Sequence, residues 1–217
     1  VISINANAQT DSTFIRKIYD EALERGESYE NLRSLCKDIG ARITGSAEAE
    51  MAIKWGEELL KSYNFDKVYL QEITVPHWER GTKEAAWIEN EKGEIRKIKI
   101  AALGMSVGTK GLMTAEVISF SSIEELKKAN RKDVEGKIVF LAQAFDQKLI
   151  RTFEAYGACY PQRGNGAEES GKLGALAVVI RSLASSTDDH PHTGTMSYGE
   201  GENKIPAAAM STIDADF

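Results

Sequence analysis

The sequence predicts an α/β fold in which a helical first third precedes a region of strands and short helices. Two observations carry this prediction. Apolar residues first recur every three to four positions, and from Val68 onward they form short β-branched runs between turns. The composition agrees, because 42% of the 217 residues are apolar and 28% are charged, which is typical of folded proteins and rules out wholesale disorder.

Charge and length narrow the class of protein further. The formal net charge of −6 argues against a non-specific nucleic-acid binder, whose surface is normally basic. No apolar run approaches the roughly 20 residues that a membrane-spanning helix needs. At about 150 residues per domain, the length predicts one or two domains. We therefore expect no nucleic-acid partner and no membrane span.

Residues 1–8 look like the end of a signal peptide. The apolar run Val1–Ile4 precedes the small-x-small triplet Ala6–Ala8, which is the pattern that signal peptidase reads; a frayed N-terminus is the alternative. The pattern predicts a secreted or periplasmic protein. In such an oxidising compartment Cys36 and Cys159 could pair, but we expect two buried free thiols, because free cysteine behaves as a small hydrophobe.

Three amphipathic helices and a strand are expected in the first third, from apolar spacing, capping residues and β-branched content. The helices extend over Phe14–Leu23 with a stop at Gly26, over Ser28–Gly40 with Ser28 as cap, and from the cap Ser46 through Tyr63. The strand is Val68–Val75, which ends at Pro76.

The remaining two thirds read as strands separated by short helices. The expected elements are a hairpin of Ala85–Glu89 and Ile95–Ile100, a strand Met113–Phe120, a capping box Ser121–Glu124 opening a helix, apolar strands Lys137–Leu141 and Ala175–Ile180 with a helix within Ala155–Gly174, a polar loop Ser182–Lys204, a strand Ala207–Met210, and a helix capped by Ser211.

The segment Gly104–Gly108 fits the G-x-S-x-G pattern of a serine hydrolase, with Ser106 as the nucleophile. Asp188 or Asp189 and then His192 follow in the order that such hydrolases use. No helical pattern follows Gly108, however, although the motif needs a strand-to-helix turn. The sequence favours a glycine-rich loop, with the serine hydrolase as an alternative.

The segment Gly166–Lys172 comes close to a phosphate-binding P-loop. It departs from the pattern at Leu173, where a Ser or Thr hydroxyl should hold magnesium. Glu168 and Glu169 would also place negative charge against the phosphates. A helix leading into a strand is therefore the favoured interpretation.

Asp188–His192 is the one place in the sequence where metal-ligating side chains crowd together. Zinc needs at least three protein ligands in a near-tetrahedral array. Pro191 breaks the helical spacing that would align two of them, so a loop would have to gather the ligands. We favour a solvated polar loop over a metal site.

Six short blocks of sequence form a distinctive series from about Thr13 onward, and His-Trp-Glu-Arg-Gly is the most distinctive segment. The blocks are Gly40–Ser46, Pro76–Gly81, Gly136–Val139, Ile180–Ser182, Pro191–Gly194 and Lys204–Pro206. In this order they resemble the carboxypeptidase Q branch of the zinc aminopeptidase superfamily.

The resemblance implies a divided architecture. Residues 9–78 would be the N-terminal part of a peptidase domain, and residues 79–217 an incomplete protease-associated domain inserted into it. The two zinc ions and the glutamate base of such enzymes come from a segment that follows the insert, so no catalytic or metal-binding residue is expected in this chain. Arg181, His192 and Thr193 lie in family-like blocks and could form a loop close to the substrate.

The sequence thus predicts the N-terminal portion of an exported zinc exopeptidase that hydrolyses dipeptides or short peptides, inactive by itself. In the intact enzyme the zinc ions would lower the pKa of a bridging water, and the family suggests a homodimer. The alternative is a stand-alone protease-associated module that binds peptide or protein partners.

Overall fold

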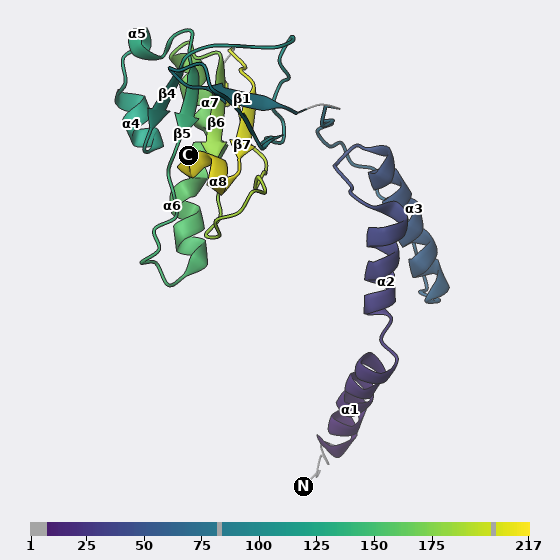
Figure 1. Cartoon of the computed structure of the whole chain (residues 1–217). Coiled ribbons are helices and arrows are strands. Elements are labelled where there is room, and N and C mark those ends of the chain that lie inside the picture. The colour runs from purple at the N-terminus through teal and green to yellow at the C-terminus, as the bar shows by residue number, and fades with distance from the viewer. Residues whose placement is uncertain (1–7, 82–83, 201–202) are drawn as a thin grey trace. The chain divides into compact units, whose positions relative to one another are not determined.

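The computed structural model describes residues 8–81, 84–200 and 203–217. The expected end of a signal peptide lies outside these residues except for Ala8, where the first helix begins. Contacts divide the chain into two compact units, one ending at Glu79 and one spanning Arg80–Phe217, and each is described by itself (Figure 1). No helix of the described residues is both long and apolar enough to cross a membrane.

The first unit consists of helices. They are α1 (Ala8–Glu24), α2 (Ser28–Ser34), which continues as the π-helical turn η1 (Leu35–Ile39), and α3 (Ala47–Ser62). Ser46 caps α3 as expected, because its side chain accepts a hydrogen bond from the Ala49 amide. Ser28 is not a cap. It is the first helical residue of α2, and Glu27 before it makes no capping hydrogen bond.

Two further expectations for the first unit are wrong. Val68–Val75 does not form a strand: the described residues of this unit hold no other strand, and an extended segment without a partner leaves its backbone groups to water. Cys36 is exposed rather than buried, although both cysteines are free as expected. None of residues 11–79 is buried, so this unit builds no core of its own.

The second unit contains two sheets. Strands β1 (Ala86–Glu89) and β2 (Ile95–Ile98) form the expected antiparallel hairpin. A five-stranded sheet has the order β3-β7-β6-β5-β4, in which β4 to β7 are parallel and β3 is antiparallel to β7. Its strands are β3 (Ile100–Ala102), β4 (Val117–Phe120), β5 (Ile138–Leu141), β6 (Ala177–Arg181) and β7 (Ala207–Met210).

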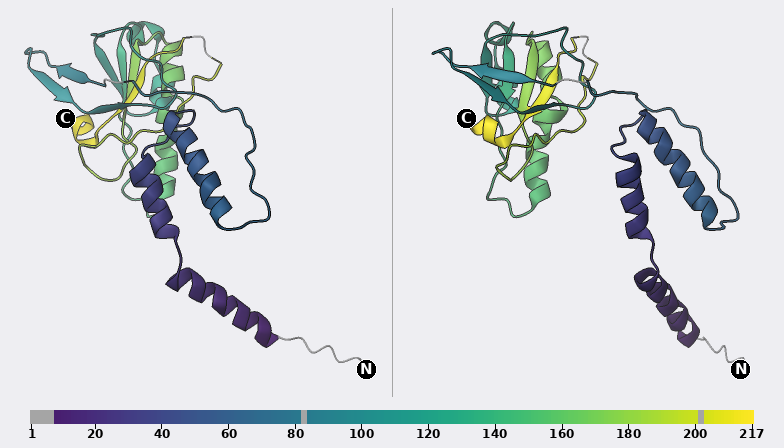
Figure 2. Two further views of the ribbon diagram at one scale, coloured as in Figure 1. Left: turned by 90° about the vertical axis from the view of Figure 1, so that its right-hand side faces the viewer. Right: turned by 45° about the vertical axis from the view of Figure 1, so that its right-hand side comes forward.

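Helices connect the parallel strands across one face of this sheet (Figure 2). They are α4 (Ile123–Lys128) and α5 (Arg131–Val134) after β4, and α6 (Thr152–Gly164) and α7 (Gly166–Lys172) after β5. Helix α8 (Thr212–Asp216) follows β7 and leads to no further strand among the described residues. A side chain at Gly166 would lie 2.8 Å from Leu141 Cδ1, so α7 packs closely on the buried face of β5 and β6. The core of the unit gathers on this face.

Local capping differs slightly from the expected pattern. Ser122 rather than Ser121 caps α4, by accepting a hydrogen bond from the Glu125 amide. Glu125 in turn accepts hydrogen bonds from the amide and hydroxyl of Ser121. Ser211 caps α8 as expected, through the Asp214 amide. Gly166–Lys172 is a helix that leads into β6, which confirms the interpretation preferred to a P-loop.

Candidate functional site

Arg181 is the last residue of β6 and is buried. Its guanidinium binds both carboxylate oxygens of Asp216 in α8, with 3.3 Å between Nη2 and Oδ2. The hydrogen bond from Arg181 lowers the pKa of the Asp216 carboxyl below its ordinary value. Arg181 therefore attaches the last helix of the chain to the carboxyl end of β6.

Ser182 and Thr193 hold the two ends of the segment that contains His192. The buried Ser182 hydroxyl donates to the Met210 carbonyl at 2.6 Å and accepts from the His192 amide at 2.7 Å. The Thr193 hydroxyl donates to the Ala102 carbonyl at 2.7 Å. With the bond from the Gly104 amide to the Gly194 carbonyl at 2.8 Å, they fix the backbone of residues 192–194 against β7 and the end of β3.

One face of α6 packs against the same segment. The rings of Tyr156 and His192 meet edge-on, with 6.0 Å between centroids. Arg163 donates from Nη1 to the Tyr156 hydroxyl at 2.6 Å, and its guanidinium also lies over the Tyr160 ring. Gly194 leaves room for this guanidinium, because a Cβ there would lie 2.7 Å from Arg163 Nη1.

Gln162 joins α6 to the carboxyl ends of β5 and β6. It is fully buried, and its amide donates to the carbonyls of Gln143 and Arg181 while accepting from the Gln143 amide. Beside it, the buried Cys159 thiol bonds to the Ala144 carbonyl. Burial raises the pKa of Cys159, so this cysteine stays a protonated, unreactive thiol at neutral pH.

The three residues expected near the substrate do not converge on one point. Arg181 binds α8, His192 contacts Tyr156 of α6, and Thr193 bonds to the end of β3. Of the three, His192 is exposed. The structure thus places one imidazole at the surface, while the Arg181 side chain binds the Asp216 carboxylate and the Thr193 side chain binds the backbone at the end of β3.

Sequence reasoning did not single out Tyr156, Tyr160 and Arg163. Their spacing at i, i+4 and i+7 puts them on one face of a helix, which is a signal present in the sequence. This helix face meets residues 192–194 because of the order of the strands in the sheet. No local sequence pattern predicts that order.

Ser106 has a structural role. Its hydroxyl donates to the Val107 carbonyl at 2.9 Å and accepts from the Ala207 amide at 2.8 Å. The described residues between β3 and β4 form no helix, so the strand-to-helix turn of a nucleophile elbow is missing. The glycine-rich loop favoured from the sequence is confirmed.

The acidic and histidine side chains of Asp188–His192 bind one another or their neighbours. Asp188 accepts hydrogen bonds from the Ser186 hydroxyl and the His190 amide. Asp189 pairs with Lys99 and with His190 Nδ1, while His192 faces Tyr156. Over the described part of the chain, no three His, Cys, Asp or Glu residues are grouped to hold a metal ion. These residues do not fit a zinc centre.

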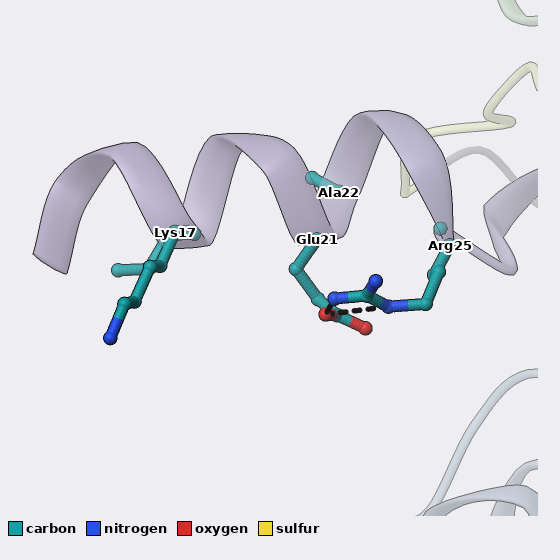
Figure 3. Close-up of a pocket in the computed structure, with 6 residues that line it drawn as sticks. Lys17, Glu21, Ala22 and Arg25 are labelled. Atoms are coloured by element: carbon teal, nitrogen blue, oxygen red, sulfur yellow. Dashed lines mark hydrogen bonds and ion pairs between the residues drawn. The ribbon is translucent and has the colours of Figure 1, made fainter. Parts of the chain in front are cut away.

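A hollow beside α1 offers no site either. Its walls come from residues of α1 and from Arg25 and Gly26 just beyond it. Figure 3 shows Glu21 and Arg25 paired along the helix surface. A hollow formed by one exposed helix segment places no groups opposite one another, so it cannot surround a ligand.

The fold is a mixed α/β arrangement of the peptidase M28 type. The peptidase M28 precursor from Shewanella amazonensis superposes with a TM-score of 0.84 at 30% identity, covering 96% of this chain and 46% of that one. A zinc aminopeptidase from Bacillus subtilis shares the fold, with a TM-score of 0.54 at 20% identity, over 88% of this chain and 40% of that one. No family model matches the chain.

Among characterised proteins, the chain is a homologue of carboxypeptidase Q. The Bos taurus protein is 39% identical over 202 residues, which are 92% of this chain and 40% of that protein. The resemblance drawn from the six sequence blocks is confirmed. The chain thus spans about 40% of the length of this relative.

Proposed function

We propose that this chain is the N-terminal portion of an exported zinc-dependent exopeptidase that hydrolyses dipeptides or short peptides. Residues 9–78 belong to its peptidase domain, and residues 79–217 are most of an inserted protease-associated domain. Similarity to carboxypeptidase Q across 92% of the chain carries the proposal. The complete enzyme is secreted or periplasmic and forms a homodimer.

Zinc belongs to the complete enzyme rather than to these residues. The similarity of the fold to a protein named as a zinc aminopeptidase supports zinc as the metal. The ligands for its two ions lie in the polypeptide beyond this chain. The 217 residues alone therefore have no peptidase activity.

The gene tests this proposal directly. We expect the reading frame to continue beyond the codon for Phe217 by roughly one domain and to encode His, Asp and Glu ligands. The encoded protein should hydrolyse a dipeptide, lose activity with a chelator and regain it with zinc. A stop codon within a few residues overturns the proposal and leaves the stand-alone binding module. A continuing frame whose product ignores the chelator overturns zinc dependence.

We also propose that Arg181 and residues 192–194, whose backbone is held through the Ser182 and Thr193 hydroxyls, lie close to the substrate. The exposed ring of His192, on a backbone fixed at both ends, supports this role. His192→Ala in the longer protein should raise the KM for a dipeptide several-fold. Exposed His190→Ala, on the same loop, is the matched control and should leave the KM unchanged. Equal KM values for His192→Ala and the parent protein would contradict the role.

A further inference from the structure

Helix α6 projects beyond the end of the sheet (Figures 1 and 2). Its last turn, Gln162–Gly164, is buried, whereas Phe153, Glu154 and Gly157 near its start are exposed. The helix starts from the edge where the parallel strands end, because residues 142–151 connect it to the end of β5. The first half of α6 and the turn before it therefore extend past the carboxyl edge of the sheet.

The most distant part of this projection is apolar. Ile150 is 98% exposed, Phe153 is 88% exposed, and Leu149 beside them is 37% exposed. We call these three residues the α6 tip. A cluster of large apolar side chains at the end of a protrusion is unusual for a free surface and marks an interaction site.

The charged residues around the α6 tip are equal in number of each sign. The Asp146 carboxylate accepts a hydrogen bond from the Lys148 amide at 2.9 Å. Arg151 pairs with Glu154 at 3.4 Å. Asp146 and Glu154 match Lys148 and Arg151 in number, so this segment has no net charge, and the apolar side chains are the feature that a partner would recognise.

The chain ends at the same edge of the sheet. Helix α8 follows β7, and Asp216 binds Arg181 at the end of β6. Any polypeptide that continues from Phe217 therefore starts on the side from which α6 projects. The carboxypeptidase Q relative has well over half of its length outside the region that this chain matches.

We propose that the α6 tip docks into an apolar surface of the polypeptide that follows Phe217 in the longer protein. This inference rests on the proposed function. A second copy of the chain fits less well, because three side chains of at most about 250 Å² each fall short of the roughly 800 Å² per partner that a stable complex buries. A covalently continuous partner needs less area, since its effective concentration is high.

Thiol accessibility tests the docking. Ile150→Cys is made in a Cys36→Ser background, which removes the exposed native thiol, both in this chain and in the longer protein. Alkylation by iodoacetamide is followed by mass spectrometry of the peptide containing position 150. Leu112→Cys is the matched control, because Leu112 is 85% exposed and lies between β3 and β4, at the opposite edge of the sheet. The buried Cys159 stays unmodified while the second unit is folded.

We expect alkylation at position 150 to be slower in the longer protein than in this chain by about tenfold or more, and to stay so after hundredfold dilution. Position 112 should react equally in both. Equal reactivity at position 150 overturns the docking while leaving the proposed function standing. Protection that disappears on dilution would mean that the α6 tip contacts a second copy of the protein, and this result also overturns the proposed docking. A gene that stops at Phe217 overturns both proposals.

Discussion

Gly194 is a residue whose missing side chain makes room for a buried charge. A Cβ there would lie 2.7 Å from Arg163 Nη1 and 2.8 Å from Arg163 Cζ. We predict that Gly194→Ala lowers the free energy of unfolding by about 1–3 kcal/mol, the usual cost of overpacking. Urea unfolding followed by circular dichroism measures it.

Gly157 provides the matched control for this substitution. A Cβ at Gly157 meets no atom within 4 Å, and the residue lies inside α6. Because alanine favours a helix over glycine, Gly157→Ala should raise the free energy of unfolding by up to about 1 kcal/mol. If both variants are destabilised alike, the contact between Gly194 and Arg163 is not the cause.

Asp214 is a buried carboxylate that ties α8 to the strands beside it. It accepts hydrogen bonds from Arg96 Nη2 at 2.9 Å, from the Lys99 amide at 2.7 Å and from the Ser211 hydroxyl at 2.9 Å. Burial alone would raise the pKa of Asp214, but these bonds outweigh it and hold the pKa below the ordinary value of 3.8.

A lowered pKa makes this carboxylate stabilising above pH 3.8, and the stabilisation is lost as the pH falls through the folded-state value. Asp214→Asn should therefore cost about 1–3 kcal/mol at pH 7, and the difference from the parent should shrink below about pH 4. Urea unfolding at pH 7, 5 and 3.5 tests this. The exposed Glu91→Gln serves as control. A pH-independent difference would count against the charged interaction.

At the scale of elements, the loop between β6 and β7 depends on one hydroxyl. The Ser182 side chain bonds both the Met210 carbonyl and the His192 amide. Ser182→Ala leaves the His192 amide without its acceptor, whereas the Met210 carbonyl keeps the Ser182 amide as a donor, so the substitution should cost about 1 kcal/mol. Hydrogen exchange of the His192 amide should quicken, because it loses its acceptor. Ser185→Ala, exposed on the same loop, should change stability by less than about 0.5 kcal/mol. Unchanged exchange at His192 would contradict the tether.

The helices and strands also differ in how well the sequence predicts them. The hairpin of β1 and β2, the apolar strands β5 and β6 and the caps Ser46 and Ser211 were predicted because their signals are local. Val68–Val75 has equally good strand composition, yet forms none, since a strand exists only where another strand pairs with it. The contact of Arg163 with Gly194 joins residues 31 positions apart, and it follows from strand order alone.

At the scale of the whole molecule, the two units differ in how they are stabilised. The second unit buries an apolar core between its sheet and helices. The first unit has no buried residue among positions 11–79, and its helices expose large side chains such as Phe14 and Leu23. Isolated helices of this length are only marginally stable in water. In the longer protein that we propose, these apolar faces would be covered by the rest of a peptidase domain.

This difference predicts that residues 80–217 carry the cooperative stability of the whole chain. Expressed alone, they should melt within about 3 °C of the 217-residue chain. At about 0.7 kcal/mol per residue, calorimetry should give an unfolding enthalpy near 100 kcal/mol for both, rather than the roughly 150 kcal/mol of a chain that unfolds as one body. The Gly157→Ala substitution should shift the two melting curves equally, since it lies within the shared unit. An enthalpy near the larger value, or a melting temperature that falls sharply on removing residues 1–79, would mean that the first unit packs into a common core.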